Sequence, residues 1–125
     1  SFPCPNYIKT YLIAGLITTA QKLFWSKCKT DSFICKTVGI QALFDVLLAI
    51  AKEGFAKKDF SVDFFVRKLE PAAEINFGNE RFKNASGSGR LLIKNCIFVK
   101  AGIEKEKIAK LKEQQRNDID EAIAA

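Results

Sequence analysis

Residues 38–51 read VGIQALFDVLLAIA, an apolar run interrupted only by Gly39, Gln41 and Asp45. The apolar side chains recur every three to four residues, which is the spacing that places them on one face of an α-helix. Because almost every position is apolar, we expect this helix to be covered on most sides and to form the central element of the fold. The stripe consists of Ile34, Val38, Ala42, Val46 and Ile50, widened by Leu43, Leu47 and Ala51.

A first helix is predicted over residues 5–27, where apolar side chains again follow helical spacing. Only about three residues, 29–31, separate it from the central helix, and so short a connection favours an antiparallel pair. Thr30 or Asp31 can cap the central helix, which is expected to end near residues 53–54. The stripe of the first helix consists of Ile8, Leu12, Leu16, Thr19 and Leu23.

Shorter helices are predicted in the second half of the chain. One covers residues 62–69, with Asp59 or Ser61 as its cap. Residues 71–82 are expected to form another short helix, broken near Gly78.

Residues 83–89 are the clearest loop in the chain. Residues 91–99 fit either a helix or a strand, and we interpret them as a helix because no partner strand is evident. From Ile103 to the end one charged helix with a narrow apolar seam is predicted. The seam consists of Ile108, Leu111, Gln115, Ile119 and Ala122.

The composition bounds both the fold and the chemistry. At 125 residues, 48% of them hydrophobic, the chain fits a single domain over residues 1–125. We predict an all-α, disulfide-stabilised bundle of about five helices. The absence of His removes the Ser/His and Cys/His catalytic pairs and the common zinc sites. We therefore predict a protein that is not an enzyme, with no catalytic residues, no metal and no cofactor.

The chain has four cysteines, Cys4, Cys28, Cys35 and Cys96, in a spacing typical of neither a redox motif nor a zinc ribbon. Along a continuous first helix, Cys4 would lie about 36 Å from Cys28, and Cys35 lies at the same end as Cys28. A disulfide needs Cα atoms about 4.4–6.8 Å apart. The remaining bridges are Cys28–Cys35 and Cys4–Cys96, although a sharp bend at Gly15 would leave other pairings open.

Several features indicate secretion. The opening Ser1-Phe2-Pro3-Cys4 in a chain without methionine is expected if a signal peptide has been removed. Asn84-Ala85-Ser86 is a glycosylation sequon in a glycine-serine loop. Neither apolar stretch, residues 11–20 or 38–51, can span a bilayer, so we expect an extracellular protein that does not insert into membranes.

The formal net charge is +6, which favours an acidic partner. The charges are interspersed rather than continuous, so we do not expect nucleic acid as a partner. We interpret the densest basic regions as candidate contacts with an acidic protein surface. They are Lys57 and Lys58 and, on either side of the glycine-serine loop, Arg81, Lys83, Arg90 and Lys94.

The eleven phenylalanines have two interpretations. They either fill a bulky aromatic core or line a cavity for a hydrophobic ligand. The second interpretation keeps open a carrier of small hydrophobic molecules, similar in size to insect odorant-binding proteins. Helices, disulfides and positive charge also leave a saposin-like membrane-active protein as a third hypothesis, although the cysteine spacing does not fit it.

Taken together, the opening FPCPNYIKTY at residues 2–11, the Cys28 and Cys35 pair around KTDSF, and the distant Cys96 resemble the anophensin and albicin type of salivary proteins from anopheline mosquitoes. The resemblance implies a non-enzymatic inhibitor of a host plasma cascade. The expected target is the alternative complement pathway, through binding of the C3 convertase (C3bBb), with contact-system factors as possible partners. It assigns no individual contact residue.

Overall fold

The computed structural model describes residues 6–27, 32–57, 61–83 and 88–125. In these ranges all regular structure is helical, which confirms the all-α prediction. These ranges contain six α-helices, rather than about five, and four short 3-10 helices. The α-helices are α1 (Asn6–Leu23), α2 (Thr37–Lys57), α3 (Val62–Leu69), α4 (Ser88–Ala101), α5 (Lys105–Ala109) and α6 (Glu113–Ala124), and the 3-10 helices are η1 (Trp25–Lys27), η2 (Phe33–Cys35), η3 (Glu70–Glu74) and η4 (Glu80–Phe82).

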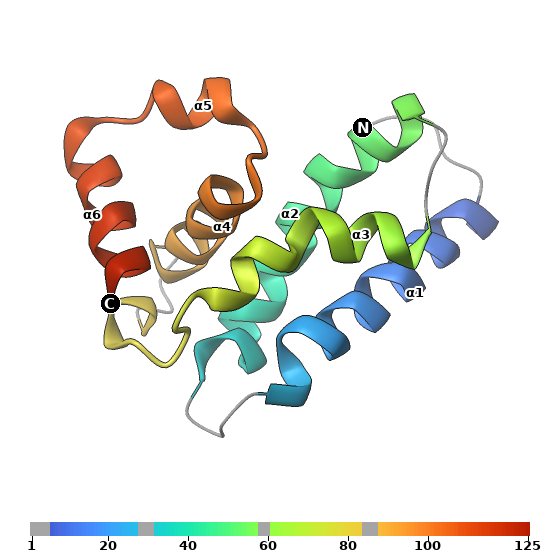
Figure 1. Ribbon diagram of the computed structural model, residues 1–125, viewed down its shortest axis with the longest axis horizontal. Helices are drawn as coiled ribbons and strands as arrows, with labels where there is room; N and C mark the ends of the chain where they lie inside the picture. The colour runs from blue at the N-terminus through green and yellow to red at the C-terminus, as the bar shows by residue number, and fades with distance from the viewer. Residues whose placement is uncertain (1–5, 28–31, 58–60, 84–87) are drawn as a thin grey trace.

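Helix α2 lies at the centre of the molecule (Figure 1). Helix α4 packs against α2, α1 packs against α3, and α6 packs against α4. The main contacts of the C-terminal helices α5 and α6 are therefore with α4. Helices α1 and α2 run in opposite directions in this view, as the short connection predicted.

Helix α1 is an α-helix without interruption to Leu23, and η1 replaces the predicted last turn. Gly15 does not break it. The hydroxyl of Thr19 donates to the carbonyl of Gly15 at 2.7 Å, so this buried polar group is satisfied within the helix. Leu16, Thr19 and Leu23 are buried as predicted, while the side chains of Ile8 and Leu12 lie outside the described part.

The predicted stripe of the central helix is confirmed, because all eight of its side chains are buried. The helix limits differ from the prediction. Ile34 belongs to η2, α2 begins at Thr37, and α2 continues to Lys57. A Cβ atom on Gly39 would lie 2.4 Å from the carbonyl oxygen of Phe33, so only glycine lets η2 fold so closely onto α2. The expected caps Thr30 and Asp31 lie outside the described residues.

Helix α3 and the segment after it follow the local signals in part. The side chain of Ser61 accepts a hydrogen bond from the amide of Phe64 at 3.1 Å, so Ser61 caps α3 as predicted; the alternative cap, Asp59, lies outside the described residues. Residues 71–82 form no α-helix but the 3-10 turns η3 and η4. Residues 91–99 are helical, in α4.

The single C-terminal helix predicted from Ile103 onwards is wrong, since the chain forms α5 and α6 there. Gly102 and Glu104 both have positive φ, 68° and 53°, which ends α4 and turns the chain. The side-chain oxygen of Gln115 then accepts from the amide of Lys112 at 3.2 Å and starts α6 as a separate helix. Ile119 remains buried as the seam predicts.

The core is rich in aromatic rings that pack against one another. The ring of Phe77 lies 5.8 Å from that of Phe24 and 5.4 Å from that of Phe82, measured between centroids. Phe64 and Phe65 form another edge-to-face pair at 5.8 Å. These contacts support the packing interpretation of the phenylalanine content.

The predicted Cys4–Cys96 bridge is not present, because Cys96 is a free and fully buried thiol in the middle of α4. Helix α4 packs against α2, α6, η3 and α3, and Cys96 lies in the core that they form. Burial raises the pKa of this thiol to about 12. Cys4 and Cys28 lie outside the described residues, so the Cys28–Cys35 bridge stays a prediction.

Candidate protein-binding surface

One side of α2 is not covered, contrary to the expectation that the helix would be enclosed on most sides. Ile40, Phe44 and Leu48 are 37%, 42% and 62% exposed. They lie four residues apart and therefore form one row along the helix, here called the outer row. Lys52, also exposed, follows one turn after Leu48. Rows of this spacing are the ridges that enter grooves in helix–helix contacts.

Beside the outer row, an ion pair joins α2 to α4. Both guanidinium nitrogens of Arg90 that face Asp45, Nε and Nη2, donate to its carboxylate at 2.7 Å. These hydrogen bonds, followed by the attraction between the charges, raise the pKa of Arg90 above its ordinary value. The bidentate pair fixes the position of α4 beside α2.

Three of the predicted basic contacts have partners within the fold. Arg90 is engaged with Asp45, and Arg81 of η4 pairs with Glu121 of α6 at 2.8 Å. Lys94 lies 5.7 Å from the centre of the Phe98 ring. Most of this positive charge is therefore used within the fold.

Lys57, at the end of α2, belongs to a separate group. It lies 3.0 Å from Glu53, and Glu53 also contacts Lys68 of α3 at 3.1 Å. Burial alone would raise the pKa of Glu53, but the hydrogen bonds from the two lysines and the attraction of their charges together outweigh it and hold the pKa below its ordinary value. Lys58 and Asn84 lie outside the described residues.

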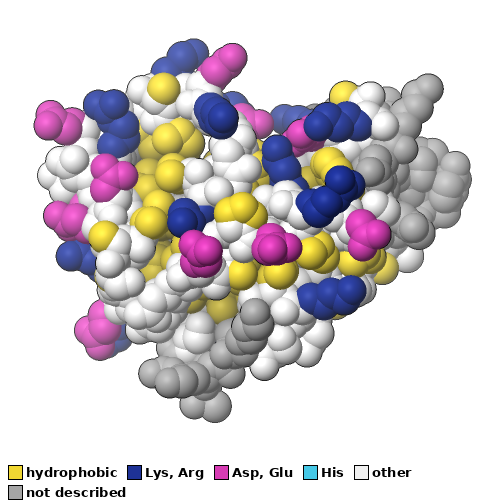
Figure 2. Space-filling model, viewed as in Figure 1, with side chains coloured by type: hydrophobic (Ala, Val, Ile, Leu, Met, Phe, Trp, Pro, Cys, Tyr) yellow, Lys and Arg dark blue, Asp and Glu magenta, His cyan; other side chains and the backbone are white. Residues whose placement is uncertain are grey.

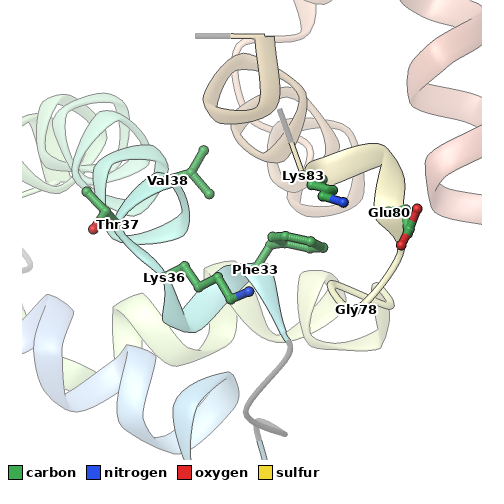
Figure 3. Close-up of a pocket in the computed structure, with 7 residues that line it drawn as sticks. All are labelled: Phe33, Lys36, Thr37, Val38, Gly78, Glu80 and Lys83. Atoms are coloured by element: carbon green, nitrogen blue, oxygen red, sulfur yellow. The ribbon is translucent and has the colours of Figure 1, made fainter. Parts of the chain in front are cut away.

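A cavity of about 430 Å³ opens where α2 begins (Figure 3). Its walls come from η2, the first turn of α2 and the segment around η4. The cavity has a mixed lining, unlike the apolar cavity that the carrier hypothesis expects. The lining residues are Phe33, Lys36, Thr37, Val38, Gly78, Glu80 and Lys83.

The face shown in Figure 2 carries basic and acidic side chains interspersed among apolar ones. No continuous area of one sign is visible on it. The described ranges contain no group of three or more His, Cys, Asp or Glu side chains that could hold a metal ion. No helix among them is long and apolar enough to cross a membrane.

The outer row left a partial signal in the sequence, because Ile40, Phe44 and Leu48 form a second stripe of period four beside the buried one. The spacing alone does not show which of the two stripes stays uncovered. The cavity carried no such signal, since Lys36 and Lys83 come from distant parts of the chain. The chain matches no protein-family model, no curated protein and no solved structure.

Proposed function

We propose that the chain is a secreted, non-enzymatic inhibitor of a host plasma cascade, acting on the alternative complement pathway by binding the C3 convertase. The observation that carries the binding mode is the outer row of Ile40, Phe44 and Leu48, left exposed on the central helix. The choice of target comes from the sequence resemblance. Contact-system factors remain the second group of partners to test.

The outer row is suited to binding because it is apolar and held in place. Burying each of its side chains against a partner contributes about 1 kcal/mol, since between a third and two-thirds of each is still exposed. The opposite face of α2 is packed in the core, so little conformational entropy is lost on binding. Aromatic residues at the centre of such a surface are frequent energetic anchors, which makes Phe44 the expected one.

Charge favours an acidic partner over a second copy of the chain. The protein carries a net charge of +6, and Lys52 extends the outer row. Two copies joined through this row would bring like charges together, whereas an acidic surface would gain from the same contact. The predicted Cys28–Cys35 bridge would hold η2 near the end of η1 and so add rigidity next to α2.

The proposal is tested by haemolysis assays with human serum. The protein should inhibit lysis by the alternative pathway and leave lysis by the classical pathway unchanged. Heat-denatured protein at the same concentration is the control for nonspecific effects of charge. Unchanged lysis in both assays would refute inhibition of complement, and a contact-system activation assay would then test the second group of partners.

A further inference from the structure

The cavity at the start of α2 has walls that are fixed before any ligand arrives. The amide of Phe33 donates to the carbonyl of Phe77 at 2.9 Å, which joins η2 to the segment that leads to η4. Gly39 allows η2 to lie directly on α2. The amide of Gly78 donates to the side chain of Asn76 at 3.1 Å and fixes the loop on the other side.

Three charged side chains surround this cavity, and none of them forms an ion pair with another described residue. Lys36 lies with its ammonium group 4.7 Å from the centre of the Phe33 ring. Glu80 is the first residue of η4 and Lys83 follows its last residue, and both side chains are exposed. In Figure 3 the two lysines lie on either side of the Phe33 ring, with Glu80 towards the edge. The lining thus carries one net positive charge beside an aromatic surface.

Carboxylates of the fold neutralise Arg90 and Arg81. At the cavity, by contrast, no described carboxylate pairs with Lys36 or Lys83, so both charges can interact with a bound anion. The volume of about 430 Å³ lies within the range of small-molecule sites. A flat apolar group can pack against the exposed part of Phe33 while its negative group lies between the lysines.

We propose that this cavity binds a small aromatic monoanion, with Phe33 packing against its ring and Lys36 and Lys83 holding its negative group. Glu80 leaves the lining with one net positive charge, which a monoanion neutralises and a dianion would exceed. The cavity adjoins the start of the outer row, because Lys36 lies one turn before Ile40, but it shares no lining residue with the row. Its occupation does not depend on the proposed inhibition of complement.

The test uses naphthalene-2-sulfonate as the probe, titrated into ¹⁵N-labelled protein and followed by NMR. The amides of Val38 and Gly78, one from each wall, should shift together along a saturable curve. Sulfate, which lacks the ring, and 2-naphthol, which is neutral at pH 6.5, should each bind at least about fivefold more weakly, because each lacks one of the two contacts.

Substitutions of opposite sign make the test specific. Lys83→Gln should weaken binding about fivefold, and Glu80→Gln should tighten it about twofold. Lys52→Gln is the control, because it also removes one positive charge but lies on α2 far from the cavity. It should leave the affinity within about twofold of the wild type. Because all three side chains are exposed, the variants should fold normally.

Two results would overturn the inference. One is a titration in which Val38 and Gly78 do not shift together, or in which sulfate binds as well as the probe. The other is equal weakening by Lys83→Gln and Lys52→Gln, which would show attraction to the net charge of the protein rather than a site. Neither result depends on whether the protein inhibits complement.

Discussion

The inner face and the outer row of α2 have the same apolar chemistry and opposite environments. Val46 and Ile50 on the inner face are completely buried, whereas Phe44 and Leu48 on the same turns of the helix are exposed. The inner face is covered because α4 and η2 pack on α2. The apolar content of α2 therefore exceeds what the fold buries, and the excess is collected in one row.

The inner face and the outer row of α2 should therefore respond differently to substitution. Burial on the inner face stabilises the fold, so substitutions there should unfold the protein. The outer row contributes little to folding and has a function only if a partner covers it. The predictions below are ordered by the size of the expected effect.

The largest effect is expected at Cys96, which lies in the same core that covers the inner face. With its pKa raised to about 12 from 9.0, its thiolate fraction at pH 8 falls roughly a thousandfold, and its reaction with a disulfide reagent should slow by at least as much. Labelling before and after unfolding without reductant, followed by peptide mass spectrometry, measures this. A Cys96 that stays unlabelled even in unfolded protein would support the Cys4–Cys96 bridge and contradict the structure.

A matched pair of substitutions tests the two sides of α2 directly. Ile50→Ala should lower the free energy of unfolding by about 3 kcal/mol, because it leaves a cavity in a fully buried site. Leu48→Ala, two residues away on the outer row, should change it by no more than about 0.5 kcal/mol. Urea unfolding measures both. Similar losses for the two variants would mean that the outer row is part of the core.

The features of the fold that the sequence predicts correctly are those set by neighbouring residues. The inner stripe of α2 and the Ser61 cap follow from spacing and residue type, and both are confirmed. The uncovered side could not be assigned, because in a helix with apolar residues on nearly every side only the tertiary contacts decide which ones are covered.

Other parts depended on geometry that the sequence does not encode locally. The chain turns at Gly102 and Glu104 through positive φ angles. The sequence did not reveal the break between α5 and α6, because the apolar side chains keep helical spacing across it. The expected Cys4–Cys96 bridge came from eliminating the other pairings, and nothing in the local sequence showed that Cys96 would lie completely buried in the core. The cavity requires Phe33 and Lys83 to be neighbours, which only the fold determines.

The smallest effect is expected at the polar end of α2. Because the pKa of Glu53 is lowered on folding, its interactions stabilise the protein above its ordinary pKa of 4.5 and are lost as the pH falls through the lowered value. Glu53→Gln should therefore cost less than about 1 kcal/mol at pH 7, and the difference from the wild type should shrink at pH 3. Urea unfolding at both pH values tests this, and a difference that grows in acid would reverse the assigned sign.

The role of the outer row is tested most directly by the affinity for immobilised C3 convertase of two variants, Phe44→Glu and Ile17→Glu. Phe44 and Ile17 are similarly exposed, at 42% and 46%, but Ile17 lies on α1. With circular dichroism confirming that both variants are folded, Phe44→Glu should weaken binding by about tenfold or more and Ile17→Glu by less than about twofold. Wild-type affinity in Phe44→Glu would contradict the assignment of the outer row as the binding surface.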